Sequence, residues 1–342
     1  MRVSDTVRFK KSQVEVTRLG LGTAPFGGLY ASVSLTDAAE AFQAAWNAGM
    51  RYFDTSPMYG HGRAEHLTGD FLRVQDPADS FTISTKVGRL FANERPGRKL
   101  PPEVAKNELD PGWYDALPFR EVFDYSYDGI MRSFDDSQMR TGLPRFDILY
   151  VHDIGRLTHG EKHAAHWSAL TAGGGFRALG ELRSAGNIKA VGLGVNEWEV
   201  VRDALEEFDL DCCLLAGRYT LLDQGAADIF LPLALQRGVD IVIGGVFNSG
   251  ILAGGKRKNP KFDYADAPAH IMERVACIEA VCAEYDTSLP AAALQYPMRH
   301  AAVTCIVIGA KTAAQIEGNV GWFEQAIPDG LWDALRQKEL IA

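Results

Sequence analysis

The sequence has no excess of positive charge. Its 342 residues carry 35 lysines and arginines against 44 aspartates and glutamates, so the formal net charge is −9 at pH 7. A protein that binds nucleic acid needs a basic surface to replace the counterions of the phosphates. The charge balance therefore argues against nucleic acid as a partner.

Long apolar runs and cysteines are also scarce. No segment supplies the roughly 20 apolar residues of a membrane span, and residues 1–11 lack the apolar centre of a signal peptide. We therefore expect no membrane partner and a soluble, cytoplasmic protein. The five cysteines are an odd number without metal-ligand spacing, so we predict reduced, buried thiols and no metal site.

A third absence is the glycine fingerprint of a Rossmann domain, GxGxxG, which joins a strand directly to a helix. The glycine-rich residues 171–180 lie in the stretch before a predicted strand, and therefore do not form such a turn. The composition is otherwise that of an ordinary globular protein, with 46% apolar and 23% charged residues. The chain has ample material for a large core.

What the sequence does contain is a repeated alternation of apolar runs and amphipathic stretches. Most of the runs are continuously apolar, which is typical of parallel strands buried on both faces. The amphipathic stretches carry helix signals; residues 35–49, for example, have Thr36 as a candidate N-cap and end at Gly49. The eight predicted strands are residues 18–23, 51–55, 81–86, 146–152, 189–195, 212–216, 240–245 and 304–309.

Eight successive strand–helix units without a linker predict an α/β fold, a (β/α)8 TIM barrel that residues 1–342 form as a single domain. Three pieces lie outside these units. Residues 7–16 predict a β-hairpin that plugs the barrel bottom. Residues 89–118 are rich in proline and glycine and predict a long loop after the third strand. We expect an extra C-terminal helix near residues 329–338.

Polar residues follow three neighbouring strands, at the end of a barrel where active sites lie. Asp54 ends the second strand and Tyr59 follows in the next loop, while Lys86 ends the third strand and His152 the fourth. Adjacent strand ends lie about 5 Å apart, so these side chains can converge. Each residue alone has a common structural role, such as a turn cap, but the combination indicates catalysis.

The phenol of this group needs a partner. Its reference pKa near 10 is too high for proton transfer at neutral pH. A neighbouring ammonium favours the phenolate, and a carboxylate keeps that ammonium charged. We therefore predict that Asp54 and Lys86 lower the pKa of Tyr59, which makes it a general acid or base, and that His152 orients the reacting oxygen.

This constellation resembles the aldo-keto reductase superfamily. Its tetrad matches Asp54 in FDTSPMYG, Tyr59, Lys86 in STKVG and His152 in LYVHD, and the resemblance runs from LGLGTAPFGG to VIGAKTAAQIEGN. It implies hydride transfer between a nicotinamide and a carbonyl or alcohol carbon of a small molecule, with Tyr59 moving the proton. The sequence carries no pattern that defines an oligomeric state.

By the same resemblance, VFNSGILAGG after the seventh strand is similar to a pyrophosphate loop, and GAKTAAQIEGN after the eighth to an adenosine-binding segment. An ordinary loop and helix start are the alternative. The implied cofactor-binding residues are Thr23, Asp54, Asn196, Tyr219, Gly245, Phe247, Asn248, Ser249, Gly250, Gly309, Lys311, Thr312, Gln315 and Asn319.

Three positions depart from the superfamily pattern around the nicotinamide. Where many members have a Ser-Asn pair, this chain offers Asn196 one place along; a glutamine position holds Ala216, and the position of the stacking aromatic holds Gly244. Tyr219 and Phe247 are the candidate replacements for the stacking aromatic.

These departures resemble a branch that contains aldose 1-dehydrogenases, of the D-threo-aldose, L-fucose and L-galactose types, and a pyridoxal 4-dehydrogenase. The branch implies oxidation of a cyclic hemiacetal to a lactone with Tyr59 as base. We expect an aldose oxidised at C1, with pyridoxal giving 4-pyridoxolactone as the alternative. Aromatic and thioether groups suit stacking on such rings, although each could also be loop packing. The candidate substrate-binding residues are Phe26, Met58, Trp113 and Trp198.

The adenosine-binding segment predicts NAD as the preferred cofactor, with NADP possible. A 2′-phosphate favours an arginine fork or several lysines. NADP-using relatives have a lysine and an arginine where this chain has Gly309 and Gln315, which leaves Lys311 as the remaining charge. A non-catalytic regulatory protein that senses nicotinamide nucleotides is the alternative from another class, and would more often show a broken tetrad.

Overall fold

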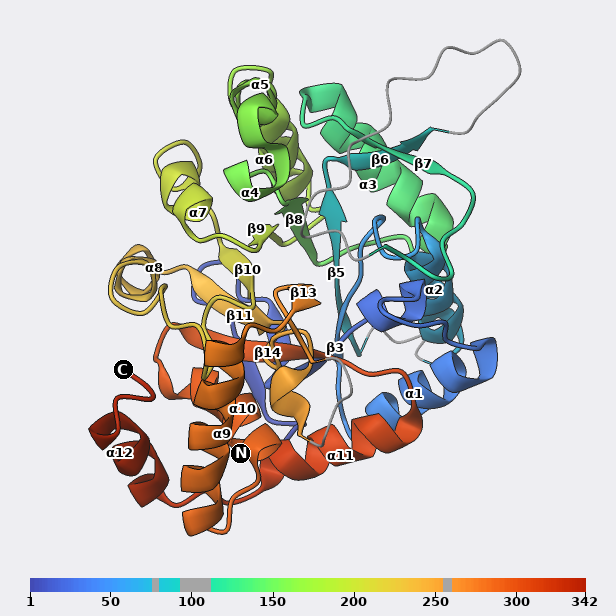
Figure 1. Cartoon of the computed structure of the whole chain (residues 1–342). Coiled ribbons are helices and arrows are strands. Elements are labelled where there is room, and N and C mark those ends of the chain that lie inside the picture. The colour runs from blue at the N-terminus through green and yellow to red at the C-terminus, as the bar shows by residue number, and fades with distance from the viewer. Residues whose placement is uncertain (76–79, 93–111, 255–259) are drawn as a thin grey trace.

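The centre of the computed structural model, which describes residues 1–75, 80–92, 112–254 and 260–342, is a closed barrel of eight parallel strands (Figure 1). The strands follow one another around the barrel in chain order, and the last pairs with the first. This confirms the predicted (β/α)8 architecture and all eight predicted strands. The barrel strands are β3 (Leu19–Gly22), β4 (Tyr52–Asp54), β5 (Thr82–Val87), β8 (Ile148–His152), β9 (Ala190–Val195), β10 (Cys212–Ala216), β11 (Asp240–Gly244) and β14 (Val303–Gly309).

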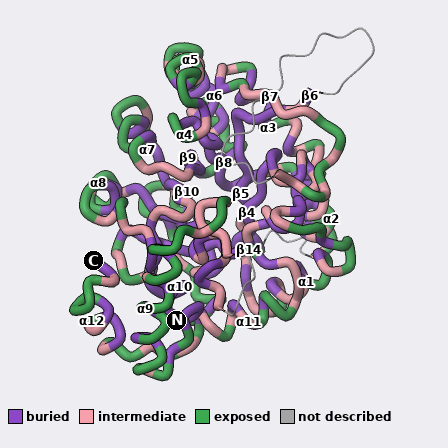
Figure 2. Tube along the Cα trace, in the orientation of Figure 1, coloured by how far each residue is buried: buried purple, intermediate pink, exposed green. Residues whose placement is uncertain are grey.

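Helices surround the barrel and turn their apolar faces toward it, so the buried chain lies at the centre and the exposed chain at the rim (Figure 2). Short 3-10 helices occur at Ala24–Gly27, Gly160–Lys162, Ile251–Ala253 and Tyr296–Arg299. The α-helices are α1 (Leu35–Asn47), α2 (Arg63–Gln75), α3 (Tyr127–Thr141), α4 (Arg156–His159), α5 (His163–Leu170), α6 (Gly175–Ser184), α7 (Glu199–Ala204), α8 (Phe230–Arg237), α9 (Ala269–Glu284), α10 (Leu289–Gln295), α11 (Ala313–Glu324) and α12 (Asp329–Gln337).

The first helix corrects a predicted cap. Ser34 is the N-cap of α1, because its extended backbone lets its Oγ accept a hydrogen bond from the Asp37 N–H at 3.0 Å. Thr36, the predicted cap, lies inside the first turn. The end of the helix is as expected, since the chain leaves through Gly49 at a φ of 90°.

A hairpin closes the amino-terminal end of the barrel, as predicted. Its strands, β1 (Thr6–Arg8) and β2 (Glu15–Thr17), pair antiparallel. Phe9 and Val14 of the hairpin are buried with residues that begin the barrel strands, such as Tyr52 and Ile148. The Lys10 N–H donates to Asp240 Oδ2 at the start of β11. The bottom of the barrel is therefore filled, and the opposite end remains for ligands.

The stretch predicted as a long loop after the third strand is only partly a loop. It begins with β6 (Arg89–Ala92), which pairs antiparallel with β7 (Arg120–Phe123), and residues 93–111 of the prediction lie outside the described residues. A second unpredicted ribbon, β12 (Lys261–Phe262) with β13 (Ala265–Asp266), follows β11. The extra C-terminal helix is confirmed as α12.

The cysteines are unpaired, and four are buried as predicted. The prediction was wrong for Cys277, which lies on an exposed part of α9. Among the residues that the structure describes, none of the helices has both the length and the apolar character needed to cross a membrane. The same residues contain no cluster of three or more side chains suited to hold a metal ion.

Candidate active site

A buried ion pair lies at the carboxyl end of β4 and β5. Asp54 Oδ2 accepts a hydrogen bond from Lys86 Nζ at 2.7 Å, and each residue is only 2% exposed. The other carboxylate oxygen accepts from Ser84 Oγ at 2.7 Å, and Lys86 also donates to the Thr55 carbonyl at 2.9 Å. These bonds satisfy both buried charges and fix the direction of the ammonium.

The ammonium of this pair faces Tyr59. Lys86 Nζ lies 4.7 Å from the centre of the phenol ring, and the ring of His152 meets it edge-on at 6.2 Å. The structure thus brings the four predicted residues together. Two glycines bring the loop of Tyr59 close to the chain after β3: a Cβ on Gly27 would lie 2.4 Å from the backbone nitrogen of Gly60. Only glycine permits this approach.

The pKa values correct the prediction for the phenol. Burial lowers the pKa of Lys86, but Asp54 and Tyr59 outweigh it and raise that pKa above its ordinary value, so Lys86 is charged. Burial also raises the pKa of Tyr59, and the opposing effect of Lys86 is smaller. The net pKa of Tyr59 is therefore above 10 in the protein alone, rather than lowered toward neutrality. Lys86 acts in the predicted direction, against a desolvation effect that the sequence did not reveal.

His152 is held as a neutral imidazole. Burial, with Arg89 and Lys86 nearby, brings its pKa well below the ordinary value. Its Nδ1 lies 3.1 Å from Ser56 Oγ. With Nδ1 accepting from that hydroxyl, Nε2 carries the proton and can donate to a ligand.

A second buried ion pair lies on the other side of His152. Asp153 Oδ2 accepts from an Arg89 guanidinium nitrogen at 2.5 Å, and Glu121 Oε1 accepts from the same guanidinium at 3.0 Å. The same Asp153 oxygen is 3.4 Å from His152 Nε2. Asp153 also adopts a φ of 45°, which is uncommon outside glycine.

These groups line a small cavity of about 90 Å³. Tyr59, Lys86 and His152 contribute to its wall, while Asp54 lies behind Lys86. Among the predicted substrate-binding residues, Met58 and Trp113 line the cavity; the ring of Trp113 lies 5.6 Å from that of Tyr59.

Two predicted substrate-binding residues lie elsewhere. Phe26 is fully buried and packs on Phe42 with ring centres 4.6 Å apart. Trp198 stacks on Phe230 of α8 with ring centres 6.1 Å apart. Neither lines the cavity, because Phe26 packs against α1 and Trp198 against α8.

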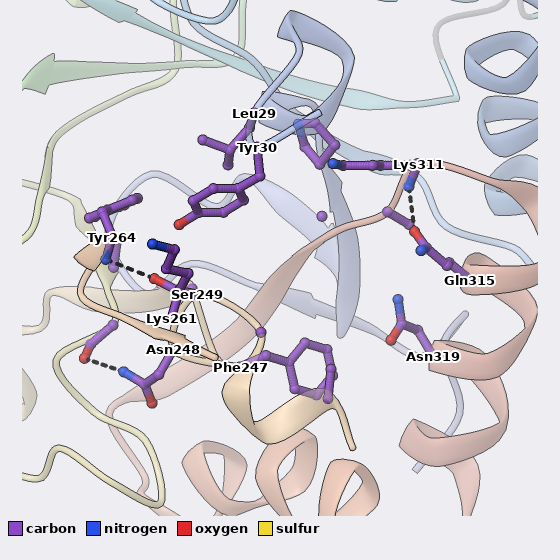
Figure 3. Close-up of a pocket in the computed structure, with 18 of the residues that line it drawn as sticks. Leu29, Tyr30, Phe247, Asn248, Ser249, Lys261, Tyr264, Lys311, Gln315 and Asn319 are labelled. Carbon is purple, nitrogen blue, oxygen red and sulfur yellow. Dashed lines mark hydrogen bonds between the residues drawn. The ribbon is translucent and has the colours of Figure 1, made fainter. Parts of the chain in front are cut away.

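Figure 3 shows a larger cavity, of about 1010 Å³. It opens beside the small one, and four residues line both: Leu29, Asn196, Ala216 and Tyr264. Small-molecule sites span about 300–1,000 Å³, so this cavity is large enough for a dinucleotide. The predicted cofactor-binding residues that line it are Asn196, Gly245, Phe247, Asn248, Ser249, Gly250, Gly309, Lys311, Gln315 and Asn319.

The other predicted cofactor-binding residues do not line this cavity. Thr23 and Asp54 are buried beneath it, with the Thr23 N–H donating to the Asp54 carbonyl at 2.9 Å. Thr312 caps α11 by accepting from the Gln315 N–H. Tyr219 packs on Tyr296 at 5.3 Å, so its ring faces the core.

The cavity wall suits an anionic dinucleotide. The chain after β11 turns through left-handed conformations at Gly245, Asn248, Ser249 and Gly250, and tight turns of this kind can form anion-binding concavities. Lys261 lines the cavity beside this loop, with its ammonium paired to Asp266 at 2.5 Å (Figure 3). The loop is anchored from below, since Asn248 Oδ1 accepts from Thr220 Oγ1 at 2.6 Å.

Sequence reasoning missed two tyrosines at the cavity mouth. Tyr264, at the turn between β12 and β13, stacks against Tyr30 at 6.3 Å, and its N–H donates to Ser249 Oγ (Figure 3). Both tyrosines have positive φ values near 65°. Their short flanking strands and turns carry no periodic signal. Asp153 was also missed, although it directly follows His152 at a strand end.

A (β/α)8 barrel with a buried Asp-Lys-Tyr-His group beside a dinucleotide-sized cavity has the features of a nicotinamide-dependent oxidoreductase. Residues 18–339 match the Aldo/keto reductase family, and the chain belongs to that family. The family and the relatives below establish an oxidoreductase and imply a nicotinamide cofactor.

Two relatives are dehydrogenases. Pyridoxal 4-dehydrogenase of Microbacterium luteolum is 60% identical over 342 residues, which is 100% of this chain and 99% of the relative. D-threo-aldose 1-dehydrogenase of Pseudomonas sp is 38% identical over 327 residues, 95% of each chain. Among solved structures, the holo form of an aldo-keto reductase from Bacillus halodurans has a TM-score of 0.72 at 20% identity, covering 99% of this chain and 97% of its own. That similarity supports the fold.

Proposed function

We propose that residues 1–342 form a single enzyme domain that oxidises the cyclic hemiacetal of pyridoxal to 4-pyridoxolactone, with NAD⁺ as the preferred acceptor. The observation that carries this proposal is the 60% identity to pyridoxal 4-dehydrogenase over the whole chain. The complete group of Tyr59, Lys86, Asp54 and His152 supports a catalytic rather than a vestigial site.

Each side chain of the group has a task in this reaction. Tyr59 removes the proton of the hemiacetal hydroxyl, and Lys86 favours the phenolate that does so. Asp54 positions Lys86. His152 donates from Nε2 to the reacting oxygen, since its Nδ1 lies within hydrogen-bond distance of Ser56. Bound NAD⁺ would supply the acceptor for the hydride that leaves the hemiacetal carbon, the carbon that bears this hydroxyl.

The larger cavity would hold the cofactor. We assign the pyrophosphate to the loop of Gly245, Asn248, Ser249 and Gly250, because its backbone geometry suits an anion. Phe247 lines the same cavity and packs edge-on against Trp322. Its place on the wall supports an aromatic contact with the cofactor.

NAD is favoured over NADP by the adenosine end of the cavity. Gln315 lines the wall, but its side-chain oxygen accepts from the Lys311 N–H at 2.7 Å (Figure 3). A glutamine held in this way carries no charge for a 2′-phosphate. Lys311 itself remains as one cation on the wall.

An aldose is the second candidate substrate, supported by the relative at 38% identity. Both candidates react as cyclic hemiacetals, so the chemistry at Tyr59 is the same. The regulatory, non-catalytic alternative is disfavoured, because both of these full-length relatives are dehydrogenases.

The test is a substrate panel with NAD⁺ and with NADP⁺, followed by absorbance of the reduced nicotinamide. Pyridoxal should give the highest kcat/KM, above L-fucose, L-galactose and D-threo-aldoses. A higher kcat/KM for any of the sugars would replace pyridoxal by an aldose.

A further inference from the structure

One carboxylate in the catalytic cavity has no role in the proposed proton transfer. Asp153 lines the 90 Å³ cavity together with Tyr59, Lys86 and His152. Asp54, the other carboxylate near the site, does not line it and is fully engaged by Lys86 and Ser84. Asp153 is therefore the carboxylate that a substrate meets.

We propose that Asp153 binds the hydroxyl group next to the reacting centre of the substrate, so that the enzyme selects cyclic hemiacetals that carry such a hydroxyl. This inference rests on the proposed function and names the substrate feature that the site recognises.

The contacts of Asp153 leave it free to bind a ligand. Arg89 holds Oδ2 at 2.5 Å, and Glu121 holds Arg89 from the other side. Oδ1 accepts a long hydrogen bond of 3.4 Å from Asn196 Nδ2. A carboxylate oxygen accepts two hydrogen bonds, so Oδ1 keeps acceptor capacity on a residue that faces the cavity.

The position of Asp153 sets which part of the substrate it can reach. Its Oδ2 is 3.4 Å from His152 Nε2, the nitrogen that would donate to the reacting oxygen. A group bound by Oδ1 of the same carboxylate must therefore lie near that reacting oxygen. Pyridoxal has its ring hydroxyl on the carbon next to the one that bears the hemiacetal carbon. An aldose has its 2-hydroxyl one bond closer, on the carbon bonded directly to C1. The pyridine nitrogen lies on the far side of the ring.

The surrounding structure holds Asp153 in an uncommon backbone conformation. Its φ of 45° is sustained by the surrounding contacts, including the hydrogen bond of its N–H to the Gly194 carbonyl at 2.9 Å. Burial raises the pKa of Asp153, while Arg89 and Lys86 oppose that rise.

The test compares two hemiacetals that differ in this feature. Pyridoxal carries a ring hydroxyl, a ring nitrogen and a ring methyl group, whereas 2-(hydroxymethyl)benzaldehyde closes to the analogous bicyclic hemiacetal without any of the three. The wild type should prefer pyridoxal in kcat/KM by about ten- to a hundredfold, the effect of one charge-assisted hydrogen bond. Asp153→Ala should lose that factor on pyridoxal and less than about threefold on the carbocyclic compound.

Glu121→Ala is the matched control. It removes the other carboxylate partner of Arg89 without changing the cavity wall, so the ratio of the two kcat/KM values should stay within about threefold of wild type. Equal losses on both substrates in Asp153→Ala would overturn the inference and leave Asp153 as a support for His152. 3-O-Methylpyridoxal keeps the nitrogen but blocks the hydroxyl; reactivity equal to that of pyridoxal would overturn it too.

Two further results need their own criteria: a variant that does not fold, and a wild-type enzyme that does not oxidise these compounds. If Asp153→Ala does not fold, the wild-type preference among the three compounds decides, and the absence of a preference overturns the inference. If the wild type oxidises none of them, the proposed pyridoxal activity fails. The inference is then decided by an aldose and its 2-deoxy analogue, which should differ by the same factor.

Discussion

Two buried ion pairs flank the small cavity at the barrel end, and they present opposite charges to it. In the pair of Asp54 and Lys86, the cation lines the cavity and the carboxylate lies behind it. In the pair of Asp153 and Arg89, the carboxylate lines the cavity and the cation lies behind. His152 lines the same cavity, within 3.4 Å of the second pair.

This difference in the charge presented to the cavity suggests a separate function for each ion pair. A buried pair contributes little to net stability, but its outer member is a charge of fixed position. The fixed cation faces the phenol whose ionisation it favours, and the fixed anion faces the space left for substrate. We therefore expect the first pair to control proton transfer and the second to control which substrate binds.

Removing the group on which the first pair acts should have the largest effect. Tyr59→Phe should lower kcat at least about 100-fold, because a positioned acid–base group contributes about 10²- to 10⁴-fold. NADH affinity, measured by fluorescence titration, should change less than about threefold, since the lost hydroxyl is not part of the proposed cofactor contacts. A variant that keeps more than about a tenth of wild-type turnover, with chemistry limiting, would remove Tyr59 from proton transfer.

Breaking the first pair should move the pH profile. The Lys86 ammonium, 4.7 Å from the centre of the phenol ring, opposes the rise in the pKa of Tyr59 that burial causes. Oxidation needs the phenolate, so the rate rises with pH until the phenol has ionised. Lys86→Met should raise the pKa of the phenol further and move the rise of the rate to the alkaline side. Oxidation at neutral pH should fall at least about tenfold, which is part of the roughly 10²- to 10⁴-fold contribution of acid–base catalysis, and should recover as the pH is raised. An unshifted profile would leave Lys86 a structural cation.

At the adenosine end of the larger cavity, the charge of Lys311 and the absence of charge on Gln315 should determine the preference between NAD⁺ and NADP⁺. With one lysine and an uncharged Gln315 on that wall, kcat/KM for NAD⁺ should exceed that for NADP⁺ by about ten- to a hundredfold. Gln315→Arg should narrow the gap, and Gln315→Glu should widen it. Equal values in the wild type would mean that another cation reaches the 2′-phosphate.

Two tryptophans sharpen the comparison between cavity wall and packing. Trp113 lies beside Tyr59 on the wall, so Trp113→Ala should raise KM for pyridoxal by about tenfold with little effect on stability. Trp198 packs on Phe230, so Trp198→Ala should lower the melting temperature and leave KM within about twofold. Thermal denaturation and steady-state kinetics on both variants provide the check. A KM effect in Trp198→Ala would place it back among the substrate contacts.

The barrel, and the positions of Asp54, Tyr59, Lys86 and His152 at one end of it, were predictable because both follow from patterns of neighbouring residues in the sequence. Continuous apolar runs mark parallel strands, and the strand-end rule then locates Asp54, Lys86 and His152. The ribbon of β6 and β7 was not predictable, since its two short strands pair across about thirty residues of irregular sequence. The direction of individual side chains was also not predictable from the sequence. Phe26 and Trp198 pack on Phe42 and Phe230 instead of lining the cavity. Tyr219 packs on Tyr296. The raised pKa of Tyr59 was not predictable either, because it is caused by burial of the side chain, which the sequence pattern does not reveal.

The product of the reaction tests the central claim most directly. Pyridoxal incubated with the enzyme and NAD⁺ should give 4-pyridoxolactone and NADH in equal amounts, because a cyclic hemiacetal that loses a hydride and a proton becomes a lactone. Mass spectrometry and proton NMR of the product, with NADH absorbance for the stoichiometry, measure both. Formation of the open carboxylic acid as the first product, or no NADH from pyridoxal under conditions where an aldose is oxidised, would contradict the account.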